Sequence, residues 1–321
     1  MKVQKGTATA ISDEGSRAKA MGDESVATAT GGVGNKATVK GDYSTAIAGG
    51  VVDGDPTANN NNTATVKGDN STAIAGSYAF GDHTANNNNN TATVRGDYSQ
   101  AVAGSFGFGE PTANNSNNTA TVRGDGSGAF ATDGNNNTAT VTATVTDAGY
   151  GDCGGDFCNF AGAGVGDNNT ATVTGYGDCG GAPCSLAVAG FGDNNTATVT
   201  GDGSAALGRF SEALARLGDN NTATVTGDGS IAASQFGDNN TATVTGDGDG
   251  DGSSLAVASR GDSNTATVTG DNSTARAGGN AMVNGDSNTA TVNGNDSHLR
   301  VLGNGNSATV TGDGLDVVVG P

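Results

Sequence analysis

The sequence predicts an all-β protein: a β-solenoid of about twelve two-strand turns with variable loops on one side. The five-residue motif Asn, any residue, Ala, Thr, Val occurs twelve times, for example at residues 62–66. Successive copies lie 18 to 32 residues apart. This spacing is typical of a repeated structural turn of about 18 residues into which loops of different length are inserted.

Each turn divides into two halves of nine residues. Ala37 precedes Ala46 by nine positions, and Val39 precedes Ala48 by the same number. Within each half, small apolar residues alternate with Thr, and a period of two predicts a short β-strand. We expect the Ala and Val side chains to face inward and the Thr side chains to face outward.

We expect one elongated domain that spans residues 1–321. Its zones are the loop-free first turns (1–34), the long-loop turns (35–134), the Cys-containing loops (135–190), and the short-loop turns with the C-terminal strand (191–321). One segment departs from the β pattern. Residues 211–218 combine a Ser that could cap a helix, an early Glu and apolar residues at helical spacing, which predicts one short helical insertion.

The composition excludes a wide hydrophobic core, because only 34% of the residues are hydrophobic, 4% are aromatic and 56 are Gly. Ala and Val can still fill a narrow solenoid whose two sheets lie close together. Disorder is the competing interpretation of such a composition. Twelve intact copies of an inward and outward alternation argue against disorder.

The net charge of −19 argues against partners such as nucleic acid or anionic membranes. No stretch approaches the 18 apolar residues that membrane insertion requires, and residues 1–15 lack the apolar segment of a signal peptide. Lys or Arg follows the motif Val in four early turns and could bind a polyanion. An Asp lies two positions after each of these cations, so we expect charge pairing. The four pairs are Lys40 with Asp42, Lys67 with Asp69, Arg95 with Asp97, and Arg123 with Asp125.

Four Cys residues form two pairs with the same spacing, and each pair lies in the loop of one turn. The pairs are Cys153 with Cys158 and Cys179 with Cys184. Two local disulfides are our interpretation, and they predict an extracellular or cell-surface location. A four-Cys zinc site across the two loops is the alternative.

Catalytic chemistry has little support in this sequence. His83 and His298 are the only histidines, neither has a repeated Ser or Cys partner, and no nucleophile elbow, phosphate-binding loop or zinc-binding His pair occurs. We expect no enzymatic activity and no cofactor. Most Asp residues lie in Gly-Asp turns, where we expect them to bind their own backbone.

Stacked turns present identical side chains as ladders, and these ladders are the expected assembly surface. Asn and Val of the motif should stack along the solenoid, beside outward files of Thr. The ladder residues are Asn62, Val66, Asn90, Val94, Asn118, Val122, Asn195, Val199, Asn221, Val225, Asn240 and Val244.

Residues 192–199 follow the pattern Gly-x-x-Asn-x-Ala-x-Val. This pattern resembles the curlin-type repeats of secreted bacterial amyloid fibres. Residues 41–49 are also similar to the head repeats of trimeric autotransporter adhesins, and the Gly-Asp run at 246–252 resembles the β-roll of RTX proteins. The curlin resemblance implies an extracellular filament of stacked two-strand turns. The RTX resemblance implies Ca²⁺ as a possible ligand.

We therefore expect a structural protein that assembles with copies of itself into a fibre. The apolar strand near the C-terminus should pair with the first strand of the next copy. The expected end-to-end contact comprises Leu315, Val317, Val319, Thr7, Thr9 and Ile11. The alternatives are an ice-binding protein, because later turns carry Thr-x-Thr arrays, and a trimeric fibre or adhesin of a virus or cell surface.

Overall fold

The computed structural model of the chain describes 28 β-strands and the turns next to them. The described residues are 2–3, 7, 9–12, 14, 16–22, 24–30, 34–40, 43, 45–49, 61–67, 72–76, 89–95, 100–104, 117–123, 128–132, 136–142, 159–164, 168–175, 185–190, 194–201, 211–216, 220–235, 239–247, 254–259, 263–278, 287–302 and 306–320. They fall into two units: Met1–Ala143 with Ala161–Asn169, and Thr144–Phe160 with Thr170–Pro321. The described residues contain no helix.

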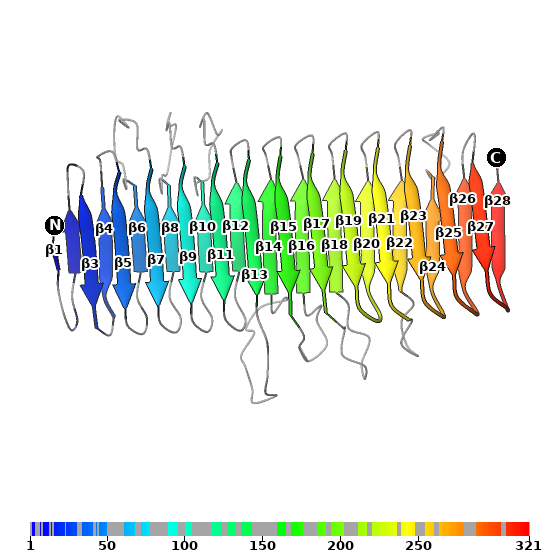
Figure 1. Cartoon of the computed structure of the whole chain (residues 1–321), viewed down its shortest axis with the longest axis horizontal. Coiled ribbons are helices and arrows are strands. Elements are labelled where there is room, and N and C mark those ends of the chain that lie inside the picture. The colour runs from blue at the N-terminus through cyan, green and yellow to red at the C-terminus, as the bar shows by residue number, and fades with distance from the viewer. Residues whose placement is uncertain are drawn as a thin grey trace. The chain divides into compact units, whose positions relative to one another are not determined.

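Unit 1 consists of two parallel sheets whose strands alternate along the chain (Figure 1). The odd-numbered strands are β1 (Lys2–Val3), β3 (Arg17–Met21), β5 (Lys36–Lys40), β7 (Thr63–Lys67), β9 (Thr91–Arg95), β11 (Thr119–Arg123) and β13 (Thr138–Thr142). The even-numbered strands are β2 (Thr9–Ser12), β4 (Val26–Ala29), β6 (Thr45–Ala48), β8 (Thr72–Ala75), β10 (Gln100–Ala103) and β12 (Gly128–Thr132). The division between the two units falls within β14 (Asn159–Gly164).

Unit 2 repeats this arrangement. Its odd-numbered strands are β15 (Thr170–Thr174), β17 (Thr196–Thr200), β19 (Thr222–Thr226), β21 (Thr241–Thr245), β23 (Thr265–Thr269), β25 (Thr289–Asn293) and β27 (Ser307–Thr311). Its even-numbered strands are β16 (Ser185–Gly190), β18 (Ser211–Arg216), β20 (Ile231–Gln235), β22 (Leu255–Ser259), β24 (Thr274–Ala277), β26 (His298–Leu302) and β28 (Asp316–Gly320). Each turn contributes one strand to each sheet, so the chain is a β-solenoid, as predicted.

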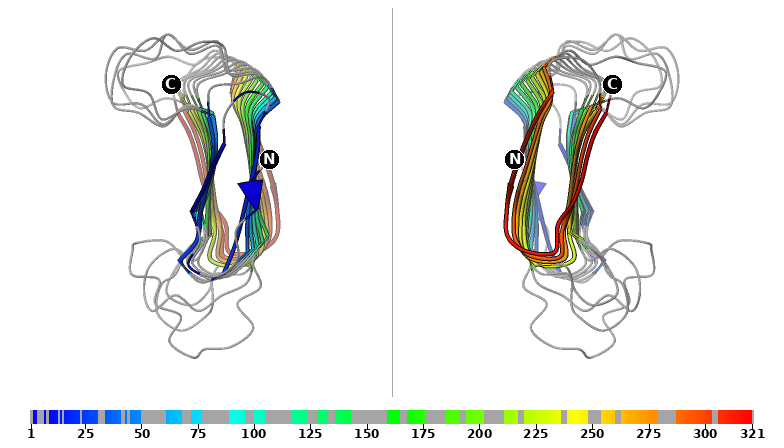
Figure 2. Two further views of the ribbon diagram at one scale, coloured as in Figure 1. Left: turned by 90° about the vertical axis from the view of Figure 1, so that its left-hand side faces the viewer. Right: turned by 90° about the vertical axis from the view of Figure 1, so that its right-hand side faces the viewer.

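The core of each unit lies between its two facing sheets (Figure 2). Ala64 and Val66 on β7 are completely buried, whereas the alternating residues Thr63 and Thr65 are half-buried. The parallel register places Val66 beside Val94 of the next turn. Small side chains permit this arrangement, because identical residues then fill a narrow interior without a wide core.

The number of turns exceeds the number of motif copies. The twelve motif strands are β5 to β27 of the odd series, and β1 and β3 precede them, so the 28 strands form fourteen two-strand turns. β3 and β4 carry the loop-free half-units of the N-terminal zone, with Ala18 and Ala27 completely buried. The in-and-out alternation predicted for these halves is confirmed.

The predicted helical insertion is wrong, because residues 211–216 form strand β18. Ala213 pairs in parallel register with Ala187 on β16 and with Ala232 on β20. The ladders on both sides of β18 satisfy its backbone groups, and this tertiary context overrides the local helical preference. The sequence signal for the strand is the alternation Ala213-Leu214-Ala215, which matches Ala187-Val188-Ala189.

The prediction that all loops lie on one side is also wrong. In unit 2, residues 201–210 connect the odd strand β17 to β18, and residues 278–288 connect the even strand β24 to β25. Odd and even strands run in opposite directions (Figure 1), so β17 and β24 end at opposite edges of the sheets, and an insertion follows each of these ends in the sequence. Either corner accepts an insertion, because a loop leaves the strand ladders intact.

Candidate assembly and binding surfaces

The Asn of the five-residue motif lies immediately before each odd strand from β5 to β27, and it is completely buried in every copy except the last, where Asn306 is half-buried. This file comprises Asn35, Asn62, Asn90, Asn118, Asn137 and Asn169 in unit 1, and Asn195, Asn221, Asn240, Asn264 and Asn288 in unit 2. Their backbone carbonyls extend the ladder, since the Thr91 N–H donates to the Asn62 oxygen at 3.1 Å. Both amide atoms of Asn90 and of Asn221 have no hydrogen-bond partner among the described residues. Burial of an amide without a hydrogen-bond partner costs free energy.

The hydrogen-bonded Asn ladder lies one residue earlier, on the solvent side of the buried file. In unit 1 it runs through Asn61, Asn89, Asn117, Asn136 and Asn168, and in unit 2 through Asn194, Asn220 and Asn239. Each Nδ2 donates to the Oδ1 of the preceding turn at 3.1 to 3.2 Å. The predicted Asn ladder is thus confirmed, and the hydrogen bonds between its side chains run through this second file, one residue before the file that the sequence predicted.

Backbone conformation favours Asn at three positions of this second file, all in unit 1. Asn61, Asn89 and Asn117 have φ angles of 60°, 59° and 63°. Among residues with a side chain, Asn adopts this left-handed conformation most readily. Gly34 occupies the same place in its turn, with φ of 78°. The doubled Asn that precedes most motif copies was the sequence signal for this second ladder.

Files of Thr cover the outer face of the odd sheet in unit 2. Strands β15, β17, β19, β21 and β23 each carry three outward Thr residues, and the parallel register stacks Thr224 beside Thr198 and Thr243. Strands lie about 4.8 Å apart, and alternate residues on a parallel strand lie about 6.6 Å apart. The result is a regular grid of hydroxyl and methyl groups. The predicted in-register Thr files are confirmed.

In unit 1 the third outward position of β5, β7, β9 and β11 carries a cation. Lys40 pairs with Lys67, Lys67 with Arg95, and Arg95 with Arg123, so the four side chains form one continuous file. All four are exposed. The sequence predicts that each of these cations pairs with an Asp. These four Asp residues lie outside the described residues: Asp42, Asp69, Asp97 and Asp125. That pairing remains a prediction.

A second ladder of side chains joins the turns of unit 2. Asp228 Oδ1 accepts the Asp247 N–H at 2.8 Å, and Asp247 Oδ1 accepts the Asp271 N–H at 2.8 Å. Asn295 continues the file, accepting the Asp313 N–H at 3.0 Å. We expected each Asp to bind its own backbone. In these turns it binds the backbone of the next turn, because the parallel stack places that N–H within reach.

The expected end-to-end contact is divided between the two units. On β28, the last strand of its sheet, Val317 and Val319 are 44% and 57% exposed, although their register partners Leu299 and Val301 are buried. Ile11 on β2 is 52% exposed. Thr7 and Thr9 are exposed as well, and Leu315 is half-buried.

Groups with possible catalytic or metal-binding chemistry are sparse in the described residues. His298 Nδ1 lies 3.5 Å from Asp316 Oδ2, and both side chains are largely exposed. No group of three or more His, Cys, Asp or Glu side chains within the described ranges could hold a metal ion. His83 and the four Cys residues lie outside those ranges, so the disulfide prediction also remains a prediction. None of the described residues belongs to a helix able to cross a membrane.

Comparison with models of known protein families, with curated proteins and with solved structures gave no match. The class of the protein therefore follows from its own architecture: a two-sheet parallel β-solenoid with side-chain ladders along its turns.

Proposed function

We propose that the chain is a non-enzymatic structural subunit that joins copies of itself into an extracellular fibre. The observation that supports this proposal is the exposure of inward-position valines on β28. Val317 and Val319 occupy the register of a buried core, yet 44% and 57% of their surface is exposed. An edge strand with apolar side chains and unpaired backbone groups is a template for another strand.

The strand β2 of a second copy is a suitable partner for β28. If the parallel register continues, Val317 lies beside Ala10 and Val318 beside Ile11. Val318 is 46% exposed and Ile11 is 52% exposed, so pairing buries two apolar side chains on the outer face as well. Every added copy presents a new β28, and a head-to-tail contact of this kind generates an open filament.

Charge placed at the β28 edge tests this proposal. Val317→Lys puts an ammonium group between the stacked cores, whereas Thr267→Lys puts the same group on the outer face of β23. Deletion of residues 315–321 removes the edge strand. We expect filaments by electron microscopy from the full chain and from Thr267→Lys, and folded monomers by size-exclusion chromatography from the other two variants. Filaments from both Val317→Lys and the truncated chain would contradict the proposal.

Ice binding is the second candidate, and the grid of Thr side chains on β15 to β23 favours it. A rigid plane of regularly spaced methyl and hydroxyl groups can order water over its surface. Thermal hysteresis of the purified chain measures this activity. Replacement of Thr198, Thr224 and Thr243 by Lys should abolish the hysteresis if the grid binds ice. Hysteresis that survives the triple substitution would contradict this candidate.

A further inference from the structure

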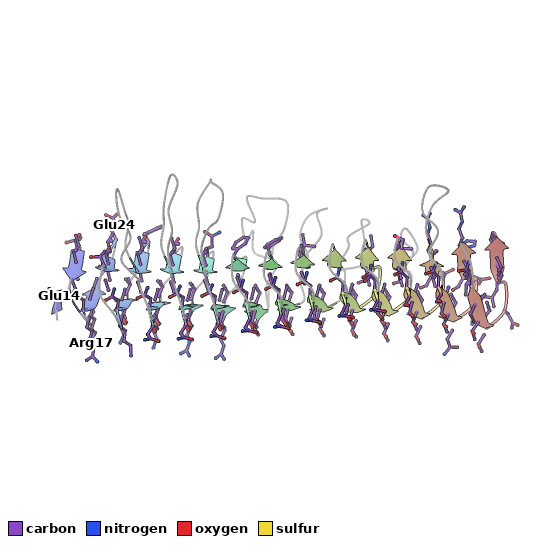
Figure 3. All side chains as sticks on the ribbon, turned by 90° about the horizontal axis from the view of Figure 1, so that it is seen from above. Glu14, Arg17 and Glu24 are labelled. Carbon is purple, nitrogen blue, oxygen red and sulfur yellow. The ribbon has the colours of Figure 1, made fainter. Side chains whose placement is uncertain are left out.

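Basic side chains gather on one outer face of unit 1 although the whole chain carries a net charge of −19. Seven of the fourteen Lys and Arg residues lie at outward positions of β3, β5, β7, β9 and β11. They are Arg17, Lys19, Lys36, Lys40, Lys67, Arg95 and Arg123. The described outward positions of β3 to β13 in this sheet include no acidic residue. In Figure 3, Arg17 extends from this outer face, whereas Glu24 lies beyond the other sheet.

Four of these cations form a straight file along the solenoid of unit 1. Lys40, Lys67, Arg95 and Arg123 are in register, so neighbouring charges are separated by one strand spacing of about 4.8 Å. No ion pair joins any of them to another described residue. Like charges side by side on a sheet are destabilising. A partner that supplies one negative charge per turn relieves this repulsion, and it would take the place of the predicted pairing with Asp42, Asp69, Asp97 and Asp125.

Neutral polar side chains lie directly beside the cation file. Thr65, Thr93 and Thr121 form the adjacent file, two residues before Lys67, Arg95 and Arg123 on the same strands. Their hydroxyl groups are half-buried and can both donate and accept hydrogen bonds. The face therefore offers a line of positive charge next to a line of hydroxyl groups.

The spacing and the side-chain types favour an acidic polysaccharide over a nucleic acid. Each strand of duplex DNA advances about 3.4 Å per phosphate, which is shorter than one strand spacing of the sheet. Proteins that bind single-stranded nucleic acid stack its bases on aromatic side chains, and the described outward positions of β3 to β13 carry none. An extended chain of uronic acids advances by roughly one strand spacing per sugar, carries one carboxylate on each sugar, and has hydroxyl groups for the Thr file.

We propose that the outer face of β5, β7, β9 and β11 binds a linear polyuronate. Each cation of the file binds the carboxylate of one sugar, and the adjacent Thr hydroxyls bind sugar hydroxyls. The four cations are Lys40, Lys67, Arg95 and Arg123. Acidic side chains that lie further than about 8 Å from the cation file oppose this binding weakly at physiological salt, because counterions screen their charge over that distance. This binding site is independent of the fibre contact at β28.

Titration of the full-length chain with polygalacturonate, followed by calorimetry, tests the proposal. The variant with Gln at positions 40, 67, 95 and 123 should bind at least about tenfold more weakly, because it loses four exposed charge contacts of up to about 1 kcal/mol each. Arg276→Gln with Arg300→Gln is the control, since these two residues form an in-register Arg pair in unit 2. The control should retain the affinity of the unsubstituted chain. Neutral dextran should not bind.

The proposal would be overturned if the fourfold variant bound polygalacturonate as tightly as the unsubstituted chain does. Equal loss in the fourfold variant and the control would also overturn it, because the effect would then reflect total charge. Single-stranded DNA with the same number of charges is the remaining probe. Binding of this DNA as tight as that of polygalacturonate would show that the face does not select a polysaccharide. If the fourfold variant fails to fold, Lys67→Gln with Arg95→Gln provides the same comparison with two charges removed.

Discussion

Asn89 Nδ2 donates a 3.2 Å hydrogen bond to Asn61 Oδ1, although 28 residues separate the two in the sequence. The contact forms because both residues occupy the same left-handed corner of successive turns. Identical side chains in identical conformations can repeat one hydrogen bond from turn to turn. The corner thus contributes to the stability of the solenoid independently of the Ala and Val core.

Removal of one member of this ladder should cost two hydrogen bonds. Asn220 donates to Asn194 and accepts from Asn239. Asn220→Ala should therefore lower the free energy of unfolding of unit 2 by about 1 to 2 kcal/mol, measured by urea denaturation with circular dichroism. Ser263→Ala is the control, because Ser263 lies at the same place in its turn without an Asn ladder bond. Equal losses in the two variants would argue against a stabilising ladder.

The same ladder can be extended. Ser263 precedes the buried Asn264 as Asn239 precedes Asn240. Ser263→Asn places an Nδ2 group in the turn next to Asn239, where it can donate a hydrogen bond to Asn239 Oδ1. We therefore expect the free energy of unfolding to rise by roughly 0.5 to 1 kcal/mol. Ser263→Gln has the same amide on a longer side chain and should give no such gain. A destabilised Ser263→Asn variant would contradict this expectation.

The sequence predicted the solenoid class because its strand signal is local. The alternation Ala64, Thr65, Val66 defines inward and outward faces without any knowledge of the neighbouring turns. The position of the hydrogen-bonded Asn file was not predictable from the motif alone. Asn61 and Asn62 are chemically identical, and only the corner geometry turns one outward and buries the other.

The helix prediction for residues 211–218 failed because contacts with neighbouring turns decide the conformation of residues 211–216. Its local signals, a Ser, an early Glu and spaced leucines, are real helix preferences of modest energy. In the fold these residues join two neighbouring strands, and every backbone group in the ladder gains a partner. The Asp ladder of unit 2 was missed because a bond from Asp228 to the N–H of Asp247 depends on the stacking of turns 19 residues apart.

Glycines whose backbone contacts the backbone of the neighbouring turn should not tolerate replacement by a residue with a Cβ. A Cβ at Gly270 would collide with the carbonyl of Gly246, and the residue has φ of 148°. Gly270→Ala should cost at least about 3 kcal/mol, because the backbone of a packed turn has to move. At Gly34 a Cβ would meet no atom within 4 Å, so Gly34→Ala should cost only the left-handed strain of about 1 to 2 kcal/mol. Urea midpoints of the two variants check this order, and a Gly270→Ala variant as stable as Gly34→Ala would contradict the close packing.

Two adjacent residues on β21 test the inward and outward assignment with a matched exchange. Val244 is completely buried and Thr243 is half-buried. Val244→Thr buries a hydroxyl among stacked valines and should cost about 1 to 3 kcal/mol. Thr243→Val makes the reverse exchange on the outer face and should change the free energy of unfolding by less than about 0.5 kcal/mol. Similar effects of the two exchanges in urea denaturation would contradict the proposed orientation of this strand.

Repulsion within the Asp file of unit 2 should appear as a dependence of stability on salt. Asp228, Asp247 and Asp271 accept hydrogen bonds in succession, and their carboxylates are stacked at about one strand spacing, 4.8 Å. At that distance two unit charges in water repel by somewhat less than 1 kcal/mol. Asn295 shows that an amide fills the same role, since its Oδ1 accepts the Asp313 N–H.

Asp247→Asn should therefore keep the acceptor for the Asp271 N–H while removing the repulsion. We expect this variant to be more stable than the unsubstituted chain by a few tenths to about 1 kcal/mol at low salt, with a difference that shrinks as salt shortens the Debye length. Asp247→Ala removes the acceptor too and should be less stable than Asp247→Asn by about 1 kcal/mol. Urea denaturation of the three proteins at low and high salt separates the two effects. A gain for Asp247→Asn that is the same at both salt concentrations would show that charge repulsion is not its cause.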